Sequence, residues 1–396
     1  MNKWMLGCCA LFTAPLWAQG GGAAGPVVQT KQLTMTAIAD TPGFPAEQRF
    51  RSRATSLVSW QGKVYGIAAG GTAYLFSVQP DGAIALVSKL PGAQDVRTAL
   101  VPDGAGNLCV GTTPPVTGDG IVQSLTHPED VTPFRDLPGG HVLCTNPTVP
   151  NAAWRDLGQV ADHEGIYTLT ADPGKHVLYG VTFPSGVFFS VNASTGQAKT
   201  HGNLYQQSRI GVDEYLRPAP RAMAVDSTGV VWTSGTRGRI YRYDPGRDVL
   251  EATELRLPGV PGRESLNVLD VLVPGPQDVL YGGTSDGYLF RLDTARLRTV
   301  NLGRATDDAG IQALMYGPGG KFYGVAGPAK GGVCRVFTYD PHESEFRVLG
   351  IIEKRDTSNY DWLLYQIDAI AADAEGRLYF AEGESPAHIA VAVPSL

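Results

Sequence analysis

The stretch SDGYLFRLD at residues 285–293 has four close counterparts elsewhere in the chain. They read GTAYLFSVQPDG from Gly71, SGVFFSVNASTG from Ser185, RGRIYRYDPG from Arg237 and GVCRVFTYDP from Gly332. In each, a glycine turn precedes a short run of apolar and aromatic residues, which is the pattern of a β-strand. A phrase that recurs along one chain predicts a repeat architecture.

The phrase is the third strand of a longer repeated unit. Each unit opens with a small, apolar strand that ends in a turn, at residues 56–62, 99–106, 168–174, 222–229, 270–277, 313–320 and 369–376. A second strand follows, with one shared position occupied by Tyr65, Cys109, Tyr179, Trp232, Tyr281, Tyr323 and Tyr379. A variable fourth strand, such as ALVSKL at 85–90, closes the unit. Seven four-stranded antiparallel repeats predict an all-β fold, a seven-bladed β-propeller.

The two ends of the chain are expected to close the ring. The last unit, from Gln366, supplies only three strands, and a lone strand at 27–39 precedes the first unit. That strand should become the outer strand of the last blade and remove an open edge. We therefore expect one propeller domain over 27–396, with an insertion at roughly 138–162. Two other long connections, 205–220 and 353–365, should rise over one end of the central channel.

The first 18 residues predict a signal peptide. Lys3 is a short positive region, Trp4 to Trp17 is an apolar run, and Ala18 offers a small residue for cleavage. A lipoprotein site at Cys8 would need a longer apolar run before it. No later stretch approaches the ~20 apolar residues of a spanning helix. We expect an exported protein, periplasmic or extracellular, without a membrane span.

Composition excludes one class of partner and leaves the cysteines open. The chain has 396 residues and a net charge of −6, with no basic block, so we expect no nucleic-acid partner. After removal of the signal peptide three cysteines remain, Cys109, Cys144 and Cys334. A Cys109–Cys144 disulfide and three buried thiols are both consistent with this count.

Motifs such as RGRIYRYDP (237–245) and VLYGGTSDGYLFRLD (279–293) resemble those of exported bacterial seven-bladed propellers. That broad class includes streptogramin-lyase-like and gluconolactonase-like proteins, and some polysaccharide lyases share its fold. The resemblance covers nearly the whole mature chain. It implies the propeller architecture, and activity must be argued from individual residues.

Polar side chains gather where the first strands begin, at one mouth of the axial channel. Strand alternation puts one set of them on the same side: Arg53, Tyr167, Arg221, Asn267, Gln312, Gln366 and Asp368. A second set lies just outside: Arg97, His163, Glu164, Tyr360, Trp362 and Tyr365. An arginine-bearing pocket rimmed by aromatic rings suits an anionic sugar. Alternatively, these polar groups only hydrogen-bond one another and water.

Three functions follow from this pocket. The first is a carbohydrate-active enzyme, a polysaccharide lyase that cleaves uronic-acid-containing glycans by β-elimination. Arg221 or Arg53 would neutralise the uronate carboxylate, Tyr167 or His163 would remove the proton at C5, and a second such group would protonate the leaving oxygen. The remaining residues of the two sets would bind substrate. The second function is a non-catalytic module that binds a glycan or a partner protein. The third is a metal-dependent, lactonase-like hydrolase.

No cofactor is predicted from a motif. The one cation site that the sequence offers is a divalent site, such as a calcium site, built from Asp368, Asn267 and Glu164, because hard cations take oxygen ligands. The histidines show no pair at metal-ligand spacing. The expected partner is a glycan or another small polar ligand at the channel mouth, bound by a monomer.

Overall fold

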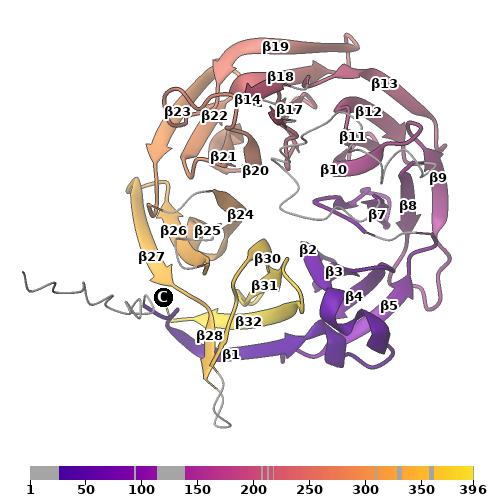
Figure 1. Cartoon of the computed structure of the whole chain (residues 1–396), viewed down its shortest axis with the longest axis vertical. Coiled ribbons are helices and arrows are strands. Elements are labelled where there is room, and N and C mark those ends of the chain that lie inside the picture. The colour runs from indigo at the N-terminus through magenta and orange to yellow at the C-terminus, as the bar shows by residue number, and fades with distance from the viewer. Residues whose placement is uncertain are drawn as a thin grey trace, which may run out of the picture.

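The computed structural model describes residues 26–92, 95–113, 139–206, 208–211, 214–216, 218–307, 310–327, 332–355 and 361–395. Within these ranges, seven four-stranded antiparallel sheets stand around a central axis as the blades of a propeller (Figure 1). The predicted fold class is confirmed. The predicted signal peptide at 1–18 lies outside the described residues.

Each blade runs outward from the axis in chain order. Blade 1 contains β2 (Arg53–Trp60), β3 (Lys63–Ala69), β4 (Tyr74–Val78) and β5 (Ile84–Lys89). Blade 2 contains β6 (Leu100–Pro102), β7 (Leu108–Gly111), β8 (His141–Thr145) and β9 (Arg155–Gln159). Blade 3 contains β10 (Gly165–Asp172), β11 (Val177–Phe183), β12 (Val187–Asn192) and β13 (Ala198–Asn203).

The second half of the ring follows the same order. Blade 4 contains β16 (Ala224–Val225), β17 (Val231–Ser234), β18 (Arg239–Asp244) and β19 (Val249–Arg256). Blade 5 contains β20 (Leu269–Pro274), β21 (Leu280–Thr284), β22 (Leu289–Asp293) and β23 (Arg298–Gly303). Blade 6 contains β24 (Ile311–Gly317), β25 (Lys321–Ala326), β26 (Arg335–Asp340) and β27 (Glu345–Gly350).

Blade 7 joins the two ends of the chain. It contains β30 (Ile367–Ala372), β31 (Leu378–Glu382) and β32 (His388–Pro394), and its outer strand is β1 (Thr30–Ala37). β1 pairs with β32 in antiparallel register, with Leu33 opposite Ala392 (Figure 1). The predicted closure is confirmed: β1 completes blade 7 as a four-stranded sheet and joins the two ends of the chain.

Two long connections form small hairpins of their own. They are β14 (Ser208–Gly211) with β15 (Glu214–Leu216), and β28 (Glu353–Arg355) with β29 (Asp361–Leu363). The helices of the described residues are short 3-10 turns: η1 (Ile38–Asp40), η2 (Ala46–Arg51), η4 (Thr236–Gly238), η5 (Pro276–Asp278) and η6 (Pro318–Gly320). No helix in the described ranges is long and apolar enough to cross a membrane.

A recurring pair of residues fills the space inside the blades. Four blades place a glycine of the second strand directly opposite a phenylalanine of the third: Gly66–Phe76, Gly180–Phe189, Gly282–Phe290 and Gly324–Phe337. A Cβ added at any of these glycines would lie closer than 3.0 Å to the ring. Blade 7 exchanges the two sizes, with Phe380 opposite Ala390. The pair therefore conserves volume across the ladder, as a close-packed interior requires.

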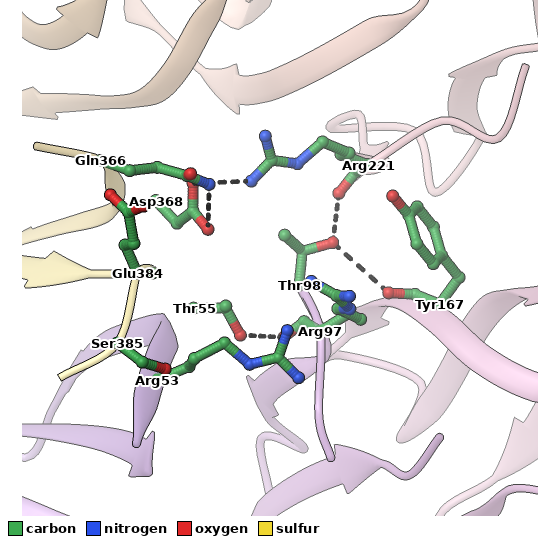
Figure 2. A pocket seen from close by; sticks show the side chains of 11 residues that line it. Arg53, Thr55, Arg97, Thr98, Tyr167, Arg221, Gln366, Asp368, Glu384 and Ser385 are labelled. Atoms are coloured by element: carbon green, nitrogen blue, oxygen red, sulfur yellow. Dashed lines mark hydrogen bonds and ion pairs between the residues drawn. The ribbon is translucent and has the colours of Figure 1, made fainter. Parts of the chain in front are cut away.

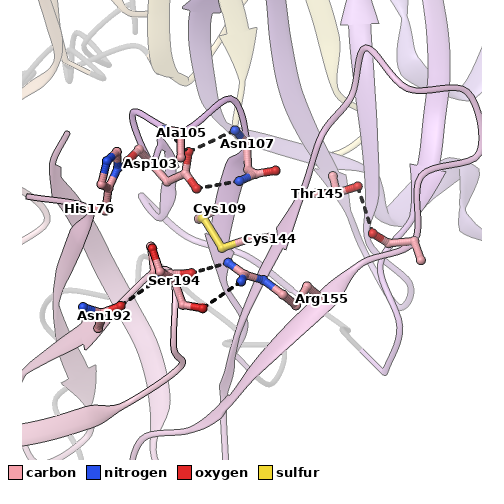
Figure 3. Close-up of a disulfide and its surroundings, with 12 residues drawn as sticks. Asp103, Ala105, Asn107, Cys109, Cys144, Thr145, Arg155, His176, Asn192 and Ser194 are labelled. Atoms are coloured by element: carbon pink, nitrogen blue, oxygen red, sulfur yellow. Dashed lines mark hydrogen bonds between the residues drawn. A yellow bond between two sulfur atoms is a disulfide. The ribbon is translucent and has the colours of Figure 1, made fainter. Parts of the chain in front are cut away.

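Blade 2 holds a disulfide where other blades hold a tyrosine. Cys109 on β7 lies opposite Cys144 on β8 and is bonded to it (Figure 3). The equivalent cross-strand pairs are Tyr65–Ser77, Tyr179–Ser190 and Tyr323–Thr338. The sequence left the disulfide open, and the structure forms it. Cys334, near the start of β26, is buried and takes no part in it.

One segment has a different structure from the one expected. The segment expected to be an insertion, roughly 138–162, supplies β8 and β9, the two outer strands of blade 2. Arg155 of β9 donates to the carbonyls of Ala193 and Ser194, which fixes this strand against blade 3 (Figure 3). The sequence between β7 and β8, residues 114–138, lies outside the described residues.

Candidate functional site

Threonine hydroxyl groups join neighbouring blades around the axis. Thr55 donates to the carbonyl of Val96 at 2.8 Å, and Thr98 donates to the carbonyl of Arg221. Thr168 donates to the same Arg221 carbonyl at 3.1 Å. These bonds satisfy carbonyl groups of Val96 and Arg221, which lie outside the strand ladders. They fix the backbone of the first strands, and with it the side chains that begin those strands.

A cavity of about 370 Å³, which we call the arginine cavity, opens at the starts of the first strands. Five blades contribute to its wall, which is formed by Arg53, Thr55, Arg97, Thr98, Tyr167, Arg221, Gln366, Asp368, Gly383, Glu384 and Ser385 (Figure 2). The sequence predicted six of these as site residues: Arg53, Arg97, Tyr167, Arg221, Gln366 and Asp368. The structure brings those six together.

Two arginines stand on one side of the cavity. Arg53 Nη2 bonds Asp95 Oδ2 at 2.5 Å, and Arg97 Nε lies 3.9 Å from the same oxygen. Asp95 is fully buried, whereas the Arg53 and Arg97 side chains are 19% and 13% exposed. A buried carboxylate thus anchors two guanidinium groups at the cavity wall, which is how a charged side chain is held in a defined position.

Arg221 lies on the opposite side, in a network that crosses the axis. Its Nη2 is 3.3 Å from Asp368 Oδ1, and its Nη1 donates to the Gln312 side chain. Gln366 donates to both oxygens of Asp368, at 3.1 and 3.2 Å. Burial by itself lowers the pKa of Arg221, but the charges of Asp368 and Asp270 outweigh it, and the net direction is upward. Arg221 is therefore a permanent cation.

Tyr167 is the buried phenol of the site. Burial raises its pKa to about 12, although the nearby Arg221 and Arg97 charges oppose the rise. The ring packs against Phe183, with centroids 5.7 Å apart. At neutral pH the hydroxyl keeps its proton, so Tyr167 can donate a hydrogen bond or a proton. It is poorly suited to the role of base that the sequence analysis offered for it.

The turn between β31 and β32 completes the wall, and the sequence analysis missed it. Gly383 N donates to the carbonyl of Gln366, and a Cβ on Gly383 would collide with the Asp368 carboxylate. Glycine is thus required for the close approach of this turn to the channel. The turn brings Glu384 and Ser385 to the cavity (Figure 2). The sequence AEGESPAH carries a turn signal but nothing that points to the axis.

A carboxyl group lies beneath this layer. Asp270 on β20 is 3% exposed and faces a second axial cavity of about 250 Å³, which shares Arg221 and Asp368 with the first. Its Oδ1 is buried and has no hydrogen-bond partner in the described part of the chain. Burial raises the pKa of Asp270 to about 7, against the opposing effect of Arg221. Gln312 lines this second axial cavity and is linked to the arginine cavity through its bond with Arg221.

The other predicted site residues lie elsewhere. His163 is exposed, in a turn before β10 with φ of +58°, and is not part of the cavity wall. Asn267 is buried, donates to the carbonyl of Pro258 and lines a separate cavity. Trp362 lines another cavity, and Tyr365, which is 45% exposed, is not part of the cavity wall. These four residues do not line the cavity that holds the arginines. Tyr360 lies outside the described residues.

The three oxygen ligands proposed for a divalent cation do not form one site. Glu164 accepts from Thr182 at 2.9 Å and from the Ser185 amide at 2.9 Å. Asn267 and Asp368 have the different partners given above. In the described ranges no group of three or more His, Cys, Asp or Glu side chains is arranged to hold a metal ion. The predicted donor set therefore does not fit a calcium ion.

Comparisons with known proteins support the fold. No protein-family signature matches the chain, and no curated protein matches by sequence. Among solved structures, virginiamycin B lyase from Staphylococcus aureus aligns with a TM-score of 0.60 and 12% identity, over 91% of this chain and 99% of that one. YCF48 bound to D1 peptide aligns with a TM-score of 0.54 and 12% identity, over 94% and 98%.

A third similar structure is an extracellular domain. It belongs to the putative one component system BT4673 of B. thetaiotaomicron and aligns with a TM-score of 0.57 and 14% identity. The match covers 86% of this chain and 38% of that one. At such identities the comparisons show a shared propeller fold, and the site has to be interpreted from its own geometry.

Proposed function

We propose that the arginine cavity binds the carboxylate of an anionic glycan, such as a polymer that contains uronic acids. One observation carries this proposal: Arg53, Arg97 and Arg221 converge on one cavity, against the acids Asp368 and Glu384. A guanidinium carries five N–H groups, so an arginine anchored on one carboxylate can bind a second one. The cavity volume of about 370 Å³ suits a small ligand or one unit of a longer one.

Binding should depend on charge and on the arginine wall. We would titrate the protein with galacturonate and mannuronate oligomers by calorimetry, with the methyl ester of each as the uncharged match. Arg53→Gln should weaken binding of the acids by roughly tenfold or more and leave the esters unaffected. Arg298→Gln, at an exposed position on the outer strand β23, is the matched control. Equal affinity for acid and ester would reject the proposal.

A specific observation favours a second candidate, β-elimination. Tyr167 keeps its proton at neutral pH and lines the same cavity as Arg221 and Glu384. With the uronate carboxylate on the arginines, Glu384 would take the proton from C5. The C4–O bond would then break, a C4=C5 double bond would form, and the Tyr167 proton would pass to the leaving oxygen.

The unsaturated product absorbs in the ultraviolet, so elimination can be followed directly in a panel of uronate polysaccharides, with and without EDTA. Tyr167→Phe and Glu384→Gln should each lower the rate by roughly a hundredfold or more while binding persists. A flat trace with every polymer would reject elimination for those substrates and leave the binding proposal intact. Both candidates fit an exported protein, and the Cys109–Cys144 disulfide supports export.

A further inference from the structure

The cavity lined by Trp362, which we call the aromatic cleft, opens beside the cavity that holds the three arginines. Its volume is about 410 Å³, and it is lined by Met35, Ala37, Ala39, Asp40, Arg49, Phe50, Lys354, Trp362, Pro386 and His388. Phe50 and Trp362 are 78% and 45% exposed. Side chains of this size normally bury most of their surface, so two exposed rings in one cleft indicate a surface that meets a ligand.

A fixed histidine forms the floor of the cleft. His388 Nδ1 lies 2.8 Å from Glu382 Oε2, and both residues are buried. The Trp362 ring packs against the imidazole, with centroids 4.9 Å apart. Because a carboxylate can only accept, Nδ1 carries the proton of this bond, and Nε2 is the ring nitrogen left for a ligand. Lys354 adds positive charge to the lining, and Arg49 forms an ion pair with Asp40 at 2.8 Å. The cleft thus combines two aromatic faces with one buried polar contact.

The aromatic cleft and the arginine cavity are neighbours across a single turn. Gly383, Glu384 and Ser385 line the arginine cavity, and Pro386 and His388 line the cleft. Ala387, between them, donates to the carbonyl of Ser52, and its own carbonyl accepts from Ile38. In Figure 1 the β28 end of the hairpin that carries Trp362 lies beside β1 and β32, at the rim of blade 7. The turn is therefore fixed on both sides and separates two adjoining sites.

We propose that the aromatic cleft is a second subsite for the same anionic glycan, so that the natural ligand is an oligomer that crosses the turn at 383–387. This inference rests on the proposed function of the arginine cavity. A sugar ring packed on Trp362 or Phe50 would place a hydroxyl group on His388 Nε2, while its acidic group meets Lys354 or Arg49. The cleft has the aromatic lining and few polar groups that ligand sites share.

Two linked subsites make affinity depend on chain length. A monomer fills the arginine cavity alone, whereas a longer chain also occupies the cleft as an intramolecular event. Calorimetric titration with galacturonate monomer, dimer, tetramer and hexamer, and with the matching mannuronate series, measures this directly. The wild-type protein should bind hexamer at least roughly tenfold more tightly than monomer. Trp362→Ala should remove that gain and leave monomer affinity unchanged.

The controls separate the two proposals. Trp362→Phe should retain most of the gain, and Tyr316→Ala, which removes a 39% exposed ring on β24 outside both sites, should retain all of it. Arg53→Gln should weaken every chain length alike. Monomer binding without any gain from length would overturn the second subsite and spare the arginine cavity. Absence of binding at all lengths in both series would overturn both.

Discussion

The second strands and the first strands of the blades obey different rules. One position of the second strand repeats a large side chain in almost every blade, from Tyr65 to Tyr379. The position that opens the first strand holds Thr55, Thr98, Tyr167, Arg221, Leu269, Gln312 and Asp368, with little repetition. Each blade packs against its neighbours in the same way, so the same kind of side chain is needed at the same position in each blade. The axis is a single place shared by all blades, so each blade can contribute a different group.

Substitutions at the glycine–phenylalanine pairs inside the blades should have the largest effect on stability. Phe337→Ala leaves a cavity opposite Gly324 and should cost about 3–5 kcal/mol of unfolding free energy. Gly324→Ala overpacks the same place and should cost about 1–3 kcal/mol. The double variant Gly324→Ala/Phe337→Ala should lose less unfolding free energy than the two single changes combined, as measured by denaturant unfolding. Val348→Ala, at a half-exposed position opposite Phe337 on β27, is the control. Strict additivity would refute volume exchange.

In the channel, a substitution should stabilise the fold instead, because the native Asp270 carboxylate destabilises it at neutral pH. The pKa of Asp270 is about 7 in the folded protein and 3.8 ordinarily. The folded state therefore binds the proton more tightly, and stability falls as pH rises from about 4 to 7. Asp270→Asn should leave stability nearly unchanged below pH 4 and raise it by up to about 4 kcal/mol at pH 8.

Thermal unfolding across that pH range measures the difference between Asp270→Asn and the wild type. Asp81→Asn, an exposed turn residue of blade 1, is the matched control and should show no such dependence. A loss of stability in Asp270→Asn at pH 8 would mean that the ionised carboxylate supports Arg221 more than burial penalises it.

Removing the disulfide tests how much stability blade 2 gains from a cysteine pair at the position where other blades have a tyrosine. It joins residues separated by 35 positions, and the Cys109→Ser/Cys144→Ser variant should lose about 3–4 kcal/mol through the unfolded chain. Reductant should lower the melting temperature of the wild type and leave that of the variant unchanged. If reductant has no effect on the wild type, the pair contributes packing alone.

The smallest effect is expected at a turn. Asp226 accepts from the Thr228 and Val230 amides and from the buried Trp232 Nε1, at 2.7 Å for the last. Asp226→Ala should cost about 2 kcal/mol, because the indole N–H loses its acceptor. Asp81, which accepts from the Ala83 amide alone among the described residues, is the matched position, and its substitution by Ala should cost less. Equal losses at both turns would show that the indole bond contributes nothing.

Part of the site could be predicted because strand alternation is local information. Arg53, Tyr167, Arg221 and Asp368 were found by aligning the seven first strands, and all four line one cavity. Glu384 and His388 were missed because the turn before β32 and the first residue of that strand carry no pattern that points to a site. Trp362 was assigned to the wrong cavity, since a long connection does not encode where its hairpin folds.

The sequence by itself determined the propeller, its seven blades and its closure by β1. Strand alternation, glycine turns and the shared aromatic position act within a few residues and recur in each blade, so they can be recognised along the chain. Only the tertiary structure decided which side chains meet. The arginine cavity joins five blades, the aromatic cleft joins three segments far apart in sequence, and the pKa values of Tyr167 and Asp270 arise from burial. Burial and convergence are properties of the folded ring, because they depend on distances that no local pattern contains.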